Sequence, residues 1–298
     1  MYSGKCEDHV STFCDPSAPC AKVNMPDGDD DAFLRALAKT DIQLTCLGIE
    51  FCLFAVADEG ICPLVTACCG PQMVHLCLDG NFWMTDAVFE ALADVGCGPN
   101  LRSLNIRYLP AVTFEGIATL IGAGCGPSLE TLVLTEIPFV DEMLQLLANV
   151  GCGSHLTHLH IDTWRSEKKV SDSGIQALAR AGCGPNLTSL KLSHSSKITD
   201  QAFEALAAAG CGPKLTHLRL ASLKNVTNAG FASLANARCG PNLETLLLWN
   251  MDKDDSGVEA LIHAGCGPKL KNFNLPFSKN PLVNDLCQKC YRSPWTCP

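Results

Sequence analysis

A tetrapeptide of sequence Gly-Cys-Gly-Pro, or a one-residue variant of it, recurs eight times along the chain. The cysteines of the eight copies are Cys69, Cys97, Cys125, Cys152, Cys183, Cys211, Cys239 and Cys266. The steps between them are 28, 28, 27, 31, 28, 28 and 27 residues. So regular a period predicts a stacked-repeat architecture, in which one structural unit is copied along an axis.

Each tetrapeptide is followed by a segment with the pattern L-x-x-L-x-L, as in Leu187, Leu190 and Leu192. With one earlier copy that lacks the tetrapeptide, nine such segments occur, from residues 44–49 to residues 270–275. The L-x-L portion alternates apolar and polar residues, which is typical of a short strand with one buried face. Each segment therefore predicts one strand.

A helix is predicted after each strand. Val170-Ser171-Asp172 and Ile198-Thr199-Asp200 are helix start signals, because Ser, Thr and Asp side chains accept hydrogen bonds from the first helix amides. Gly182 and Gly210 follow two of these helices, and glycine readily adopts the left-handed conformation that ends a helix. One unit is therefore strand, turn, helix, turn.

Stacked copies of this unit bury their leucines against one another. Strands stack about 4.8 Å apart, whereas packed helices need about 8–10 Å. The mismatch predicts an α/β solenoid with the form of a curved horseshoe, a parallel sheet on its concave side and helices on its convex side. The repeated cysteines are expected to be reduced and buried, since a buried cysteine behaves as a small apolar residue.

This pattern resembles the leucine-rich-repeat family over residues 41–280. The cysteine before each strand and the Ile-Thr-Asp or Val-Ser-Asp helix starts are similar to its cysteine-containing class, found in F-box subunits of ubiquitin ligases. The 28-residue step is similar to the ribonuclease-inhibitor class. One position of the repeat, three residues after the last strand leucine, departs from the family, which often has Asn or Cys at that position. The residues of this column are Asn81, Leu109, Ile137, Trp164, Ser195, Leu223 and Met251. We expect mainly apolar packing in that column.

We divide the chain into an irregular N-terminal cap at 1–40, about nine repeats at 41–280 and a C-terminal cap at 281–298. Cysteines also occur in both caps, at Cys6, Cys14, Cys20, Cys287, Cys290 and Cys297. The C-terminal three are compatible with a cap that closes the core or with part of a structural zinc site. The acidic run at 27–31 precedes a predicted helix, and negative charge stabilises a helix N-terminus.

The net charge of −9 disfavours nucleic acid and anionic membranes as partners, because both would repel the chain. The first residues show no secretory signal, and no apolar run approaches membrane-spanning length. We therefore expect a cytoplasmic protein, a monomer, with a protein partner and with neither cofactor nor metal.

The strand pattern places polar and cationic side chains on the concave face. The residues predicted to bind a partner are His158, His160, Lys191, His217, Arg219 and Trp249. Lys and Arg suit an acidic segment of the partner, and Trp249 would be an aromatic anchor. Because histidine titrates near neutrality, binding is expected to strengthen as the pH falls toward 6.

The 31-residue step contains an insertion between strand and helix, and extra loop length in a repeat protein is typical of a contact region. The inserted loop contributes Trp164, Arg165, Lys168 and Lys169, which would extend the basic patch. An ordinary tolerated insertion is the alternative.

A third cluster, Cys46, His75 and Cys77 on adjacent predicted strands, has the residue types of a zinc site or of a Cys–His nucleophile. Three functions therefore stay open. The first is a non-catalytic protein-binding scaffold, not an enzyme. The second, implied by the resemblance, is a substrate-recognition adaptor of an SCF-type ubiquitin ligase. The third is a metal-binding or thiol enzyme or sensor.

Overall fold

The computed structural model describes residues 20–23, 30–40, 42–50, 57–251, 256–274 and 281–284. The chain forms two compact units, Met1–Leu129 and Glu130–Pro298. Five of the cap cysteines lie outside the described residues: Cys6, Cys14, Cys287, Cys290 and Cys297. Residues 27–29 of the acidic run also lie outside them.

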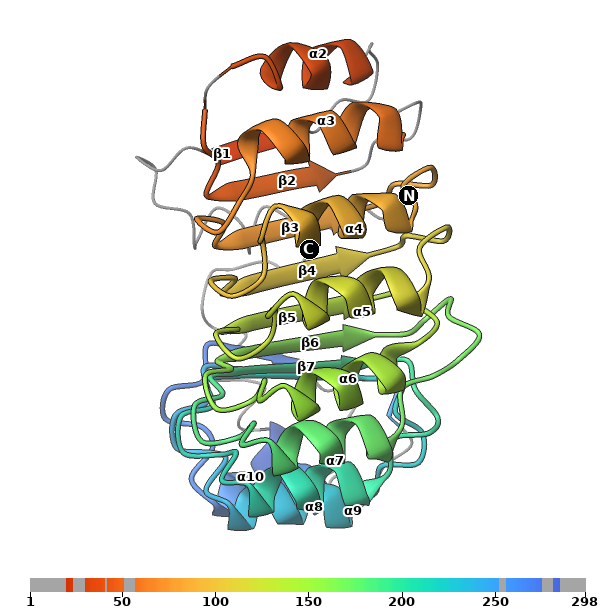
Figure 1. Ribbon diagram of the computed structural model, residues 1–298. Coiled ribbons are helices and arrows are strands. Elements are labelled where there is room, and N and C mark those ends of the chain that lie inside the picture. Colours follow the sequence, from red (N-terminus) through yellow and green to blue (C-terminus); the bar gives the residue numbers. More distant parts are fainter. Residues whose placement is uncertain are drawn as a thin grey trace. The chain divides into compact units, whose positions relative to one another are not determined.

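Unit 1 alternates strands and helices. Its elements are β1 Cys20–Val23, α2 Asp30–Leu37, β2 Cys46–Glu50, α3 Asp58–Cys68, β3 His75–Asp79, α4 Asp86–Asp94, β4 Ser103–Arg107 and α5 Phe114–Gly122. The four strands pair in parallel and in chain order, with the helices on one side of the sheet (Figure 1). Strand β1 lies within the predicted N-terminal cap, where the leucine pattern is missing.

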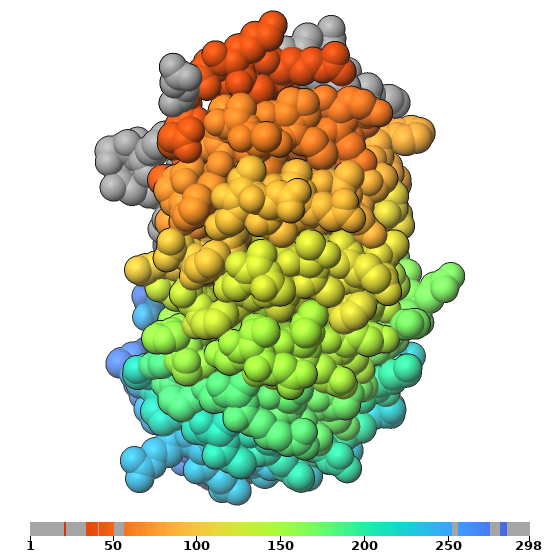
Figure 2. Space-filling view, viewed as in Figure 1, coloured from red at the N-terminus to blue at the C-terminus, as the bar shows by residue number. Residues whose placement is uncertain are grey.

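Unit 2 repeats the same alternation. Its elements are β5 Thr131–Thr135, α6 Val140–Asn149, β6 His158–Asp162, α7 Asp172–Arg180, β7 Ser189–Ser193, α8 Asp200–Ala208, β8 His217–Ala221, α9 Asn228–Asn236, β9 Thr245–Trp249, α10 Ser256–His263 and β10 Asn272–Asn274. All six strands are parallel and in chain order. Successive helices of this unit form successive bands on the surface (Figure 2).

The core lies between each sheet and its helices. Leu190 and Leu192 of β7 are fully buried, as are Phe203 and Phe231 of the helices. The strand residues between the leucines point to the opposite side, which we call the outer sheet face. The predicted strand–helix repeat is therefore confirmed in both units.

The repeated cysteines are buried at all eight positions, as predicted. Cys97 shows why the position suits a thiol: its Sγ donates to the Gly70 carbonyl oxygen of the preceding repeat at 3.3 Å. Burial raises the pKa of Cys152 and of Cys211 to about 12. The thiols of Cys152 and Cys211 therefore stay protonated and unreactive at neutral pH.

Helices of neighbouring repeats are joined by a hydrogen-bonded ladder at their N-termini. Asp200, which begins α8, accepts the backbone N–H of Thr227 at 2.7 Å and its hydroxyl at 2.6 Å. The Thr227 hydroxyl in turn accepts an amide N–H from the first turn of α9. The same pair of bonds joins Asp58 to Thr85, Asp86 to Thr113, Asp141 to Ser171 and Asp172 to Thr199.

Glycine near the start of some helices makes room for this carboxylate. A Cβ on Gly116 would lie 2.2 Å from Asp86 Oδ1, and one on Gly230 would lie 2.6 Å from Asp200 Oδ1. The Gly230 amide donates to that same Asp200 oxygen at 2.9 Å. A side chain at these positions would displace the ladder.

Gly182 and Gly210 have φ of +93° and +89°, so both end their helices in the left-handed conformation, as predicted.

The inserted loop changes which residue is buried in the column that was expected to pack by apolar contact. Trp164 is 53% exposed, whereas Ser166 is 9% exposed and donates to the Ile137 carbonyl oxygen at 3.1 Å. The insertion therefore moves the buried position of this repeat from residue 164 to residue 166.

We predict opposite effects of one substitution at the two ends of α5. Gly116→Ala should destabilise the protein by about 1–3 kcal/mol, because the added methyl group overlaps the Asp86 carboxylate. Gly122→Ala should be neutral or stabilising by up to about 1 kcal/mol, because nothing lies within 4 Å of its Cβ and alanine favours a helix. Urea denaturation of both variants measures the difference. Equal stability of the two variants would contradict the proposed role of the ladder.

Candidate functional site

The outer sheet face of unit 2 carries five of the six predicted binding residues in two rows across β6, β7 and β8. His160, Lys191 and Arg219 are direct neighbours in the strand register. His158 and His217 flank Ser189 in the row beside them. Trp249 ends β9, in register with Ala221. The predicted residues therefore share one surface.

The predicted residues of this surface differ in exposure. His160 is only 9% exposed, so a partner could reach little of its side chain. Lys191 is half-buried and Arg219 is exposed. Trp249 is 53% exposed. The accessible part of the predicted site thus lies on β7, β8 and β9.

This face is cationic within an acidic chain. Lys191 and Arg219 lie in register on neighbouring strands, so adjacent positions of this face carry two positive charges. Among the outer-face strand residues that the structure describes in unit 2, Asp162 is the one acidic side chain. Its Oδ1 is already 3.0 Å from His194 Nδ1.

The histidines of this face differ from the expectation. Burial is the largest cause that lowers the pKa of His158 and of His217, and the neighbouring charge of Arg219 also lowers the pKa of His217. Each Nδ1 lies 2.8 Å from the hydroxyl of the preceding threonine. Protonation therefore requires a lower pH than for an exposed histidine, and the charge at neutral pH rests on Lys191 and Arg219.

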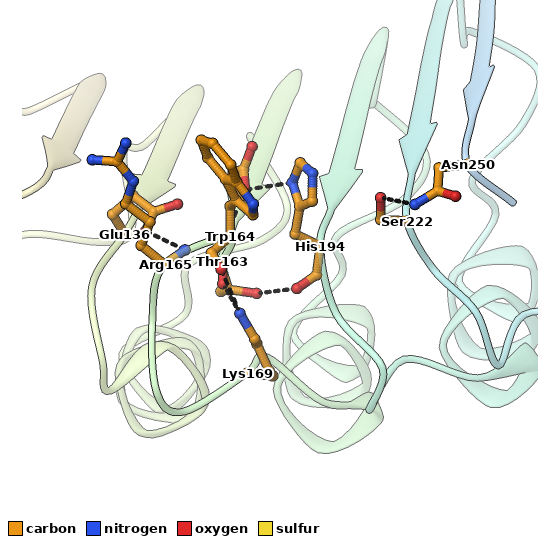
Figure 3. A network of polar contacts seen from close by, with 9 residues as sticks. Glu136, Thr163, Trp164, Arg165, Lys169, His194, Ser222 and Asn250 are labelled. Atoms are coloured by element: carbon orange, nitrogen blue, oxygen red, sulfur yellow. Dashed lines mark hydrogen bonds and ion pairs between the residues drawn. The ribbon is translucent and has the colours of Figure 1, made fainter.

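The inserted loop forms a second group of exposed side chains at the carboxyl ends of β6 and β7. Trp164 projects from the loop, and its ring lies between the Arg165 guanidinium and the His194 ring (Figure 3). The guanidinium carbon is 5.1 Å from the indole centroid, and the His194 ring centroid is 5.8 Å from it. We call Trp164, Arg165 and His194 the strand-end ledge.

The lysines of this loop do not extend the basic patch as predicted. Lys169 turns inward, where its ammonium donates to the carbonyl oxygens of Thr163 and Trp164. Lys168 is exposed and lies 3.5 Å from Glu142 Oε1. Lys169 thus stabilises the inserted loop, because its ammonium bonds two backbone carbonyl groups of the same loop.

The outer sheet face of unit 1 holds the predicted Cys46, His75 and Cys77. Cys46 and His75 are direct neighbours in register, but both cysteines are buried. The Cys77 thiol lies 3.6 Å from Glu50 Oε1 and 3.2 Å from the Asn105 amide nitrogen. Among the described residues, no group of three or more His, Cys, Asp or Glu side chains is arranged to hold a metal ion.

These contacts continue into a buried ion pair. Arg107 donates through Nε to Asn105 Oδ1 at 2.9 Å, and its Nη1 lies 3.8 Å from Asp79 Oδ2. Asp79 is 4% exposed. Burial raises its pKa, Arg107 opposes the rise and the Glu50 charge adds to it, with a result of about 6. This cluster resembles a packed polar network more than a reactive thiol site.

Comparison with known proteins supports the fold. No protein-family model matches the chain. Rad7, in a crystal structure of the Rad7 and Elc1 complex in yeast, matches 83% of this chain and 52% of its own, with a TM-score of 0.50 and 20% identity. This match and the strand–helix repeats confirm the predicted fold class, an α/β leucine-rich-repeat architecture.

A second similarity covers less of the chain. The antagonist of mitotic exit network protein 1 from Eremothecium gossypii is 36% identical over 78 residues, which are 26% of this chain and 19% of that protein. The chain thus spans about half of the structural relative and about a fifth of the sequence relative. In the part of the chain that the structure describes, no helix has the length and apolar character needed to cross a membrane.

We predict that Asp79 makes unit 1 more stable in mild acid. The folded-state pKa of about 6 lies above the ordinary 3.8, so the folded state binds a proton more tightly than the unfolded state. The contribution of Asp79 should therefore rise as the pH falls from 7.5 to 5. Asp79→Asn, which cannot titrate, should lack this rise when denaturation curves at the two pH values are compared with those of the wild type. An identical pH dependence in the two proteins would exclude the raised pKa.

Proposed function

We propose that this protein is a non-catalytic binding scaffold whose outer sheet face in unit 2 receives an acidic segment of a protein partner. The residues assigned to the site remain His158, His160, Lys191, His217, Arg219 and Trp249. Lys191, Arg219 and Trp249 make the accessible contacts, and the three histidines line the surface beside them.

The adjacent Lys191 and Arg219 side chains are the observation that carries the proposal. They place two positive charges on adjacent strand positions, and a bound carboxylate would interact favourably with both. The Arg219 guanidinium forms no ion pair with any residue that the structure describes. A planar guanidinium suits a carboxylate because it can donate two parallel hydrogen bonds.

Trp249 supplies the apolar part of such a contact. Its indole ends β9 on the same face and is 53% exposed, and large aromatic side chains contribute strongly to protein interfaces. Parallel strands hold these three residues at fixed spacing. A partner would therefore meet a surface whose backbone loses little freedom on binding.

The narrower adaptor hypothesis still rests on the resemblance of the repeats to the F-box-type class. It predicts that ubiquitin-ligase subunits co-purify with the full chain. Co-purification of other proteins alone would leave the scaffold as the better description.

The test is a charge reversal on the face. Partners are captured from a cell lysate on the immobilised full chain and then compared between variants. Lys191→Glu with Arg219→Glu should lower the captured amount of a specific partner at least about tenfold, since two charge-assisted contacts are lost. Added salt should weaken capture by the wild type.

The matched control is Arg180→Glu with Arg238→Glu, which makes the same change in net charge on exposed residues of the helix side. It should capture the partner normally. If instead this control loses the partner and the face variant retains it, the helices bind the partner and the proposal fails. Helical circular dichroism and melting of both variants show whether the fold is kept.

A further inference from the structure

We propose that the strand-end ledge is a second contact point for the same acidic segment, with Arg165 receiving a carboxylate and Trp164 packing against an apolar side chain beside it. The inference rests on the proposed function and names the chemistry of the partner segment more closely.

The inserted loop is held in one conformation by several hydrogen bonds. Lys169 bonds the Thr163 and Trp164 carbonyl oxygens, and the Thr163 hydroxyl donates to the His194 carbonyl oxygen at 3.0 Å. The Trp164 amide donates to Asp162 Oδ1 at 3.0 Å. A loop fixed so thoroughly still leaves its indole 53% exposed. An exposed, pre-positioned tryptophan is typical of an interface anchor.

The nearby carboxylates are already engaged. Glu136 Oε2 accepts the Arg165 backbone N–H at 2.5 Å. Asp162 Oδ1 accepts the Trp164 amide and lies 3.0 Å from His194 Nδ1. The Arg165 guanidinium rests against the indole. Its charge interacts with that of Glu136, but no described carboxylate lies within ion-pair distance of the guanidinium.

This stacking prepares Arg165 for an anion. A guanidinium that lies against an aromatic ring keeps its N–H edge available for two parallel bonds to a carboxylate. The exposed edge of Trp164 adds apolar area next to that edge. The ledge therefore fits an acidic residue that is followed or preceded by an aromatic or aliphatic one.

The ledge is also within reach of the sheet-face cations. Lys191 and His194 are three residues apart along β7 and its end, which corresponds to about 10 Å of extended chain. The Trp164 ring and the Arg165 guanidinium lie beyond His194, with steps of 5.8 Å and 5.1 Å between the groups. An extended segment of about six or seven residues could therefore contact Lys191 and Arg165 together. The acidic segment would cross the carboxyl edge of the sheet from one site to the other.

The test uses two synthetic peptides and the full chain. One peptide is three glutamates long, too short to reach from the sheet face to the ledge, and the other has Phe-Glu added at both ends. Binding is measured by fluorescence anisotropy of a dye on the peptide. The wild type should bind the extended peptide more tightly. Arg165→Gln should weaken the extended peptide about tenfold and leave the glutamate-only peptide unchanged.

The matched control is Lys168→Gln, which removes one charge from the same loop but outside the ledge and should have little effect. If Arg165→Gln binds the extended peptide normally while Lys191→Glu with Arg219→Glu does not, the ledge proposal is overturned and the sheet-face function stands. If only Arg165→Gln weakens binding, the ledge stands and the sheet-face function fails. If the wild type binds neither peptide at millimolar concentration, the acidic chemistry of both sites is overturned.

Discussion

The hydrogen bonds between the aspartate that begins one helix and the hydroxyl that caps the next set the arrangement of neighbouring repeats. Each carboxylate accepts one backbone N–H and one hydroxyl proton from the following repeat, as Asp200 does from Thr227. The carboxylate also places negative charge beside the positive end of the next helix. The two bonds fix the distance and direction between the N-termini of neighbouring helices.

This ladder explains why so short a unit is repeated so faithfully. A single strand and helix cannot bury its own apolar residues, so stability comes from contacts between neighbours. Gly116 and Gly230 are required where the carboxylate meets a helix backbone. Cys97 makes a comparable bond between repeats beyond the C-terminal end of α4, where its thiol donates to the Gly70 carbonyl oxygen. Substitutions at these positions should disturb the join between two repeats more than the repeat itself.

Much of the repeat architecture could be predicted from the sequence, because the spacing of the leucines and cysteines is visible directly in the chain. The leucine and cysteine periods gave the strands, the helices, the buried thiols and the rows that bring Lys191 beside Arg219. Burial on the outer face could not be predicted, because it depends on neighbours distant in sequence; His160 is buried although its column suggests exposure. The inward turn of Lys169 depends on the directions of two carbonyl groups, and strand β1 has no leucine pattern to reveal it.

Hydroxyl-radical footprinting with the captured partner shows whether the sheet face and its edge in unit 2 contact that partner, because Trp249, Trp164 and Trp83 are all exposed, at 53%, 53% and 60%. We expect the partner to slow oxidation of Trp249 and Trp164 and to leave oxidation of Trp83 in unit 1 unchanged. Oxidation of Trp249 at the same rate with and without the partner would contradict the proposed contact.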